Sequence, residues 1–379
     1  MNALKLADNI ARLRRERKLT QEELADFLGV TKASVSKWEN HQSTPDILLL
    51  PQLASFFDVT VDELLGYEAQ MSKEQIRKCY LDLSGDFVKL PFEEAMKKIH
   101  TLQHRYYACY PFLLEICILY LNHFMLAEKE EERRQVLREA ETLCDRILNC
   151  CSDVAVCEDA MALRAMLNLQ LGKTAEVMEA LESISLPGRL SEQNDSLLIQ
   201  AYMQAGEIEK AKNHTQVRIY LSLLNLIETQ IYFLALYEND LKRCEESIRR
   251  GRGIIELYDL EHLHPNSAAQ FYFQAAIVFI KNGEKKKTLE MLDSFSRCVI
   301  RLLDGNKTLL HGDAYFDRLD FWIENLPLGD QAPRDLSLAI KSALQSLEHP
   351  LFSELKQETA FQRIYCRISG EKMDERGKI

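Results

Sequence analysis

The chain has 379 residues, of which 46% are hydrophobic and 28% are charged, a composition typical of globular proteins rather than of disordered or fibrous ones. It carries 47 Lys and Arg against 58 Asp and Glu, a net charge of −11, which argues against a protein that coats nucleic acid along its whole length. Pro and Gly are scarce, at 9 and 14 residues. Because all-β domains need many such turns, we expect an all-α protein.

Several motifs are absent from the sequence. It contains no P-loop, no G-x-G-x-x-G, no G-x-S-x-G and no H-E-x-x-H, so we expect no enzyme, no cofactor and no metal site. The ten cysteines have irregular spacing and no C-x-x-C pair, which fits reduced thiols in a cytosol; the role of the group from Cys144 to Cys157 stays open. The N-terminus lacks the apolar core of a signal peptide, and the most apolar stretch, residues 110–121, is too short to span a bilayer. We therefore expect a soluble, cytoplasmic protein with no membrane partner.

Residues 6–66 show the pattern of five short helices. In the first, apolar residues recur at positions 6, 10 and 13, on one helical face. Thr20 and Glu23 have the spacing of a capping box for the second helix, and Gly29 can adopt the left-handed conformation that ends it. Later helices contain an apolar stripe over residues 50–57 and a second capping-box pattern at residues 60 and 63. These signals predict a compact helical head.

The third helix, expected after Thr31, has a polar outer face. Val35 and Trp38 are three residues apart and are expected to point inward. The residues left on the outer face are Lys32, Ala33, Ser36, Lys37 and Asn40. A lysine can donate to guanine, a serine can pair with several base edges, and an alanine can contact the thymine methyl group. This face therefore suits the major groove of DNA.

The segment L-R-R-E-R-K-L-T-Q-E-E-L-A-D-F-L-G-V-T-K-A-S-V-S-K-W-E-N, followed by P-x(12)-D-V-T-V-D-E-L-L, resembles the Xre/Cro-type helix-turn-helix domain of phage repressors and bacterial regulators. The resemblance covers residues 6–65 and implies a five-helix, lambda-repressor-like DNA-binding domain at 6–66, with the helix-turn-helix motif at about 20–40. It also implies a structural salt bridge between Arg14 and Glu39. With the outer face of the third helix, the candidate DNA contacts are Gln21, Lys32, Ala33, Ser34, Ser36, Lys37 and Asn40.

Two features of the head leave questions open. His41 stands where the family usually has Gly after W-E-N, and because His tolerates a positive φ less well than Gly, the conformation of this loop is uncertain. Residues 1–66 contain 8 basic and 10 acidic side chains, so any phosphate contact depends on a local basic face on the first and third helices. The alternative is a helical head that binds only protein.

Residues 70–370 contain a recurring turn. It appears as L-G-K at 171–173, A-G-E at 205–207, E-N-D at 238–240 and N-G-E at 282–284, so the central residues are 34, 33 and 44 positions apart. A period near 34 is that of a helix-turn-helix repeat, in which neither helix can bury its apolar face alone. The segments around 158–185, 191–212, 225–250 and 271–295 resemble tetratricopeptide (TPR) repeats, which implies a TPR-like α-solenoid, with a frayed tail at 371–379.

In such arrays the first helix of each pair lines a groove that holds an extended or helical peptide. The matching positions are Gln193, Gln200, Gln204, Gln230, Phe233, Gln270 and Gln274. Glutamine amides there could clasp a peptide backbone. The alternative is that the Phe belongs to the core and the glutamines are solvated.

Together these features predict a sequence-specific DNA-binding transcriptional regulator. One head on one half-site binds weakly, so we expect a homodimer on double-stranded DNA. The body is expected to dimerise and to sense a short peptide or a protein partner, because regulators of similar build in Gram-positive bacteria sense signalling peptides. Two alternatives stay open: a regulator whose body binds a protein and no small ligand, and a TPR-type scaffold whose head no longer reads DNA.

Overall fold

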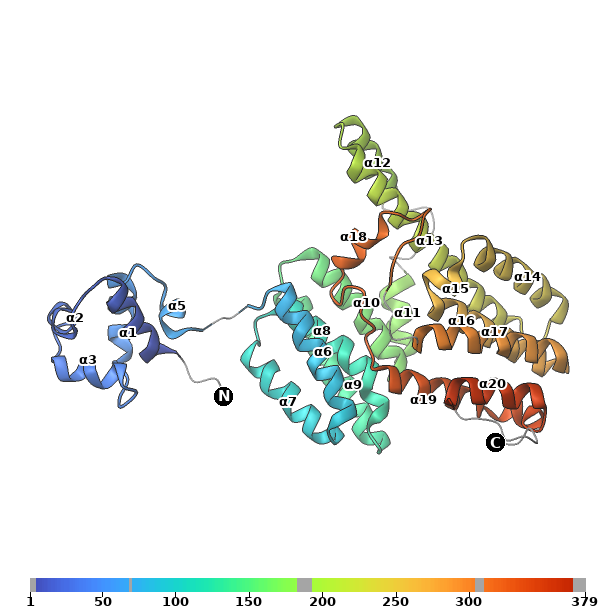
Figure 1. Cartoon of the computed structure of the whole chain (residues 1–379), viewed down its shortest axis with the longest axis horizontal. Helices are drawn as coiled ribbons and strands as arrows, with labels where there is room; N and C mark the ends of the chain where they lie inside the picture. The colour runs from blue at the N-terminus through green and yellow to red at the C-terminus, as the bar shows by residue number, and fades with distance from the viewer. Residues whose placement is uncertain (1–4, 68–69, 183–192, 304–309, 371–379) are drawn as a thin grey trace. The chain divides into compact units, whose positions relative to one another are not determined.

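The computed structural model describes residues 5–67, 70–182, 193–303 and 310–370, and these ranges are helical with no β-strand (Figure 1). The all-α expectation is therefore confirmed for the described residues. The expected frayed tail, residues 371–379, lies outside them. The chain divides into two compact units, Met1–Ser72 with Thr101–Leu113, and Lys73–His100 with Leu114–Ile379.

The N-terminal unit begins with five α-helices that follow the expected order. They are α1 (Leu6–Glu16), α2 (Gln21–Leu28), α3 (Lys32–Glu39), α4 (Leu50–Phe56) and α5 (Val61–Leu65), with a 3₁₀ turn, η1 (Ile47–Leu49), before α4. Thr20 and Glu23 form the predicted capping box at α2, and a second box starts α5. Gly29 adopts the left-handed conformation, with φ 67°, and ends α2. The local signals in the sequence therefore set these helix ends.

The core of this unit takes one fully buried side chain from each of the five helices. These are Ile10, Leu24, Val35, Leu53 and Leu64, all with 0% exposure. Trp38 is buried beside them, as its spacing from Val35 predicted. Burying each aliphatic side chain contributes about 1.5–3 kcal/mol, which offsets the conformational entropy of a small domain.

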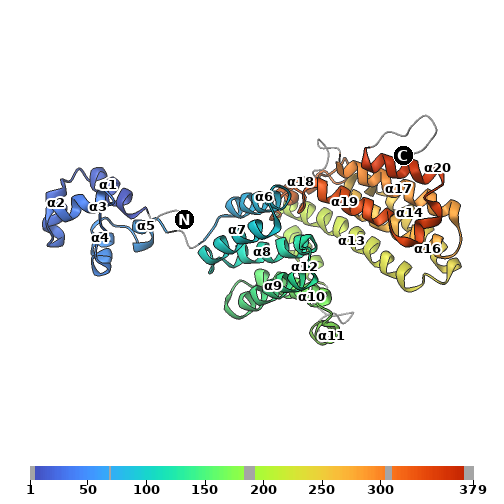
Figure 2. The same ribbon diagram turned by 90° about the horizontal axis from the view of Figure 1, so that it is seen from below.

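The second unit contains most of the remaining helices, and the ends of α7 and α8 belong to the first. The helices are α6 (Lys73–Lys89), α7 (Phe92–Arg105), α8 (Tyr110–His123), η2 (Phe124–Leu126), α9 (Glu130–Cys150), α10 (Val154–Gln170), α11 (Thr174–Glu182), α12 (Asn194–Gln204), α13 (Ile208–Leu236), α14 (Leu241–Leu257), α15 (Leu260–Leu263), α16 (Pro265–Lys281), α17 (Lys285–Leu303), α18 (Leu319–Glu324), α19 (Leu336–Leu347), η4 (Pro350–Leu355) and α20 (Thr359–Ser369). Consecutive helices pack as pairs, for example α9 with α10 and α16 with α17 (Figure 2). The body is thus a TPR-like array of helical hairpins.

Three of the four predicted turns share one hydrogen-bond pattern. Gly172, Gly206 and Gly283 each adopt a left-handed φ between 75° and 78°. In each turn the next residue donates its N–H to the carbonyl five residues before it, at 2.9 Å in all three cases. Only Gly adopts this φ without strain, which explains why the turn could be recognised in the sequence. The fourth turn uses Asp240 instead, whose carboxylate accepts from the N–H of Arg243.

The predicted repeats at 191–212 and 225–250 share one helix and do not form two separate hairpins. The helix expected to end the 191–212 repeat and the helix expected to begin the 225–250 repeat are one continuous helix, α13. Residues 208–236 contain no Gly and no Pro, so nothing in this segment interrupts the helical hydrogen bonds. The separate repeat boundary expected here is therefore wrong, although both turns that flank α13 are present.

A segment near the C-terminus packs back onto α6. The Arg77 guanidinium donates to the carbonyls of Glu324, Leu326 and Pro327 at 2.7–3.0 Å. Tyr80 and Ser84, on the same helix, donate to the carbonyl of residue 333 at 3.1 and 3.3 Å. About 250 residues of sequence separate these partners. Backbone carbonyls of the segment 324–333 therefore hold it to α6.

One described helix, α13, is long and apolar enough to cross a membrane by length and composition. It is longer than the stretch at 110–121 that the sequence suggested as the most apolar. Its inward side chains, among them Tyr220 and Ile227, belong to the core of the body. A core helix of a water-soluble protein passes the same test, so this is weak evidence for a membrane span.

Candidate nucleic-acid interface

Helices α2 and α3 are joined by a very short connection. The N–H of Val30 donates to the carbonyl of Ala25 and so closes the end of α2. Thr31 then caps α3, with its hydroxyl oxygen accepting from the N–H of Ser34 at 3.2 Å. Val35 and Trp38 fix the inward face of α3 in the core. These constraints hold the rotation of α3, and with it the direction of its outer side chains.

The structure leaves most of the predicted reading face accessible. Lys32, Ala33, Lys37 and Asn40 are exposed, while Gln21, Ser34 and Ser36 are half-buried. The hydroxyl of Ser34 lies 2.8 Å from the hydroxyl of Thr31, within the helix cap. The Asn40 amide donates to the carbonyl of Ser36 at 2.8 Å. Lys37 is the exposed cation of this face for which the structure gives no ion-pair partner among the described residues.

Lys32 has a competing partner on the neighbouring helix. Its ammonium lies 3.2 Å from a carboxylate oxygen of Glu22, and both side chains are more than half exposed. An exposed pair of this kind contributes little to stability, about 0–1 kcal/mol. The carboxylate nevertheless places a negative charge beside a cation that the sequence assigned to DNA, which weakens the attraction to phosphate. Sequence periodicity within single helices gave no sign of this pair.

The pair Arg14–Glu39 is a two-point ion pair between α1 and α3. Arg14 donates from Nε to Oε1 of Glu39 at 2.6 Å and from Nη2 to Oε2 at 2.9 Å. Its remaining terminal nitrogen donates to the carbonyl of Leu19 at 2.6 Å. The two side chains are only 12% and 5% exposed. The structural role implied for this pair fits these contacts, because losing either partner would leave the charge of the other buried and uncompensated.

Gln21 belongs to the same network in this structure. Its side-chain amide donates to Oε2 of Glu39 at 2.8 Å, so in this structure the amide faces Glu39. Burial opposes ionisation of Glu39, but hydrogen bonds from Arg14 and Gln21 outweigh it and hold the pKa of Glu39 below its usual value. The carboxylate is thus ionised over the physiological pH range and locks α3 to α1.

The loop after α3 adopts the conformation that the family's usual glycine would favour. His41 has φ 59°, in the left-handed region where a side chain is strained. Its imidazole lies 3.2 Å from a carboxylate oxygen of Asp8, on the exposed surface. His41 thus occupies a left-handed conformation at the position of the family's usual glycine.

The residues assigned to the body groove lie on three helices. Gln193 precedes α12, Gln200 and Gln204 lie on α12, Gln230 and Phe233 on α13, and Gln270 and Gln274 on α16. Gln230, Phe233 and Gln274 are half-buried, and the other four are exposed. Only the Gln230–Phe233 pair is brought together here in one described pocket, of about 570 Å³ between α13 and α14. The Oε1 atom of Gln230 is buried there without a hydrogen-bond partner among the described residues.

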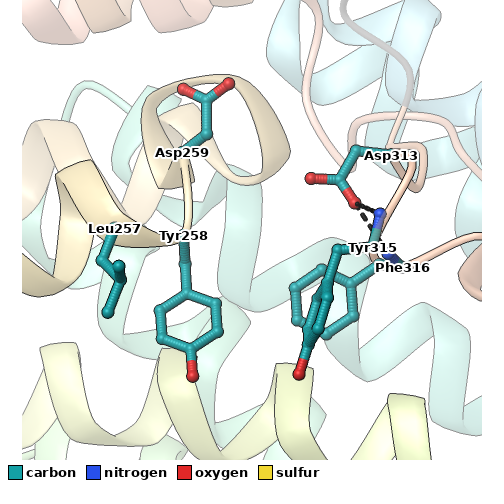
Figure 3. A pocket seen from close by; sticks show the side chains of 6 residues that line it. All are labelled: Leu257, Tyr258, Asp259, Asp313, Tyr315 and Phe316. Carbon is teal, nitrogen blue, oxygen red and sulfur yellow. Dashed lines mark hydrogen bonds between the residues drawn. The ribbon is translucent and has the colours of Figure 1, made fainter.

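A second pocket of about 350 Å³ lies near the end of α14. Tyr258 and Tyr315 line it with their hydroxyl groups pointing the same way, and Asp313 holds the loop by accepting from two backbone N–H groups (Figure 3). The rings pack against one another, with the Tyr258 and Tyr315 centroids 6.2 Å apart. Phe316 belongs to the body core and Tyr258 packs against it, whereas Tyr315 is 59% exposed.

The cysteines show no metal-binding arrangement in the part of the chain that the structure describes. All ten are free thiols, and no group of three or more His, Cys, Asp or Glu side chains there could hold a metal ion. Cys144 is buried on α9, while Cys150 is exposed at its end. Burial raises the pKa of Cys117, which neighbours Cys144, and a raised pKa makes a thiol unreactive.

Comparisons with known proteins agree with this description of the first unit. A helix-turn-helix family model, HTH_3, matches residues 10–64. The chain is 41% identical over 61 residues to the HTH-type transcriptional activator BcrR of Enterococcus faecalis, which covers 16% of this chain and 30% of BcrR. It is 31% identical over 93 residues to YonR, an SPbeta prophage-derived HTH-type transcriptional regulator of Bacillus subtilis (strain 168), covering 24% of this chain and 86% of YonR.

The match to BcrR thus spans less than a third of that relative's length. Among solved structures, Bacillus thuringiensis PlcR in complex with the peptide PapR7 and DNA aligns with 81% of this chain and 97% of its own. The identity is 14% and the TM-score is 0.25. A TM-score of this size does not establish a common arrangement of the helices.

Proposed function

The chain belongs to the family of HTH-type transcriptional regulators, and we propose that it is a sequence-specific DNA-binding transcriptional regulator. The observation that carries this proposal is the outer face of α3, where Lys32, Ala33, Lys37 and Asn40 are exposed. The core fixes the opposite face through Val35 and Trp38, so α3 can enter the major groove without rearrangement. Such a regulator acts in the cytoplasm, where its DNA is.

The proposed active species is a homodimer. One head makes only a few phosphate contacts, which by themselves give micromolar or weaker affinity. Two copies of α3, about 34–36 Å apart, would reach successive major grooves on one side of the duplex. The net charge of −11 is compatible with DNA contact through α3 alone, because an acidic body repels DNA elsewhere.

The proposal is tested by selecting fragments of genomic DNA with the purified full-length protein. A recurring, two-fold related sequence is the expected result, and binding is then measured by fluorescence anisotropy on that site and on a scrambled duplex. Lys37→Ala should weaken operator binding about tenfold to a hundredfold, with a much smaller effect on the scrambled duplex. Lys286→Ala removes the same charge from an exposed position on α17 and should change neither affinity. Equal affinity of the Lys37 variant and the parent for every selected site would exclude DNA reading by α3.

We further propose that the body binds a peptide or protein partner through the pocket between α13 and α14. Gln230 lines this pocket with its carboxamide side chain, and Phe233 lines it with its ring. A glutamine carboxamide can pair with the backbone of a bound peptide, and an aromatic ring can cover an apolar side chain. The test immobilises the full-length protein, selects binders from a random peptide library, and repeats the selection with Phe233→Ala. Selected peptides that bind both proteins equally would place the partner elsewhere or favour a regulator without a small ligand.

A further inference from the structure

A pocket of about 510 Å³ lies between the α8–α9 connection and α19. Its size falls within the range of small-molecule binding sites. Three cationic side chains line it, Arg133 from α9, Arg334 from the segment before α19, and Lys341 from α19 itself. Glu128 is the single carboxylate among the described lining residues. A chain with an excess of 11 negative charges therefore gathers a local excess of positive charge here.

Two of the three cations lack a counter-charge. The structure gives no ion pair between Arg334 or Lys341 and any residue that it describes. The Nε atom of Arg334 is buried and has no hydrogen-bond partner among the described residues. Arg133 is partly committed, since its Nε donates to the carbonyl of Ala127 at 2.7 Å. An Nε–H group removed from water without a partner is costly, so this edge of the half-buried guanidinium is left unsatisfied.

Two groups near Arg334 on the protein side are uncharged at neutral pH. Burial, together with the nearby Arg334 charge, lowers the pKa of His123 to about 4, so this imidazole is neutral. Burial also raises the pKa of Tyr80 far above its usual value. Burial likewise lowers the pKa of Arg334, which is the expected response of a cation without a counter-charge. A group that occupies the pocket can supply the missing charge.

We propose that this pocket binds a small oxyanion, a molecule that carries a phosphate or a carboxylate group. The planar Arg334 guanidinium can pair with two oxygens of such a group, and Lys341 supplies a second charge. Gln345, which also lines the pocket, provides an amide for the rest of the ligand. A bound anion would tie α19 to the α8–α9 connection, on the segment that Tyr80 and Ser84 already hold to α6. The inference does not depend on DNA binding by the head.

The test measures thermal unfolding of the full-length protein at constant ionic strength. Chloride is replaced by millimolar inorganic phosphate, pyrophosphate, acetate or citrate, so that the phosphate and carboxylate sources are separate arms. At least one of these probes should raise Tm by about 2 °C or more, because a ligand that binds only the folded state stabilises it. If no probe shifts Tm and isothermal calorimetry detects no binding, the proposal is overturned.

Three variants separate a ligand site from a structural role. Arg334→Met should keep or raise Tm in chloride, since it removes an unpaired charge, and should weaken anion binding by about tenfold or more. Lys341→Gln, at an exposed position of α19, should weaken binding without affecting the fold. Lys286→Gln, on α17, is the matched control and should respond like the parent. Equal anion responses in Lys341→Gln and Lys286→Gln would overturn the proposal, even if the Arg334 variant does not fold.

Discussion

Removing the carboxylate of Glu39 should unfold much of the head, because it leaves the Arg14 guanidinium buried without its partner. The perturbation is Glu39→Ala, which breaks two charge-assisted hydrogen bonds of 2.6 and 2.9 Å and also the bond from Gln21. Breaking a buried pair from one side costs about 3–5 kcal/mol. A domain of this size has a total stability of only about 3–9 kcal/mol. With a urea dependence of about 1 kcal/mol per molar, the unfolding midpoint should fall by about 3–5 M.

The assay uses the two tryptophans of the chain. Trp38 is buried in the head and Trp322 packs on the core of the body, so in a Trp322→Phe background the emission follows the head alone. Urea unfolding of the full-length protein is then recorded with and without Glu39→Ala. The matched control is Glu16→Ala, which breaks an α1 ion pair whose side chains are 54% and 56% exposed. Glu16→Ala should lower the free energy of unfolding of the head by less than about 0.5 kcal/mol.

Two further results test the reasoning behind this prediction. The double variant Arg14→Met with Glu39→Met should lose less stability than Glu39→Ala, because no unpaired charge remains. The pKa of Glu39 is lowered in the folded state, so its stabilising contribution is present above the pKa of the unfolded chain and disappears as pH falls through the folded value. The parent should therefore lose more head stability on acidification than Glu39→Gln does. Equal losses of head stability in Glu39→Ala and Glu16→Ala would refute this account.

Four other substitutions have defined expectations. Glu22→Gln should tighten DNA binding, most clearly at low salt, because it frees Lys32, whose ammonium lies 3.2 Å from the carboxylate. Unchanged affinity would count against a role of Lys32 in DNA binding. His41→Gly should raise head stability by about 0.5–1 kcal/mol in the Trp38 assay, since φ is 59°. Gly251→Ala should destabilise the body by about 1–3 kcal/mol, because a Cβ there would lie 2.3 Å from a ring carbon of Phe271. Gly253→Ala, where a Cβ would meet nothing within 4 Å, should stabilise the body by about 1 kcal/mol. Calorimetric unfolding measures both changes.

The candidate reading face could be derived from the sequence because its determinants are local. The caps at Thr20, Gly29 and Thr31 fix where α2 and α3 begin and end, and the spacing of Val35 and Trp38 fixes which side of α3 is buried. Each of these signals acts within about four residues of the chain, the reach of a helical hydrogen bond. The glycine turns of the body were recognisable for the same reason.

Contacts between distant segments were not derivable in this way. Arg14 and Glu39 are 25 residues apart, and only the resemblance to a family pointed to their pairing. The carbonyls that Arg77 holds lie about 250 residues further along the chain. Nothing in local periodicity relates such positions, because helix packing decides which surfaces meet.

The sequence by itself therefore determined the all-α class, the ends of the head helices and the outward face of α3. Only the tertiary structure decided that Glu22 neutralises Lys32, that Gln21 faces Glu39, and that Arg334 lies in a pocket without a counter-charge. The physical reason is the range of the interactions. Hydrogen bonds and side-chain periodicity along a helix are written into neighbouring residues, whereas the energy of a charge depends on every group that packing brings around it.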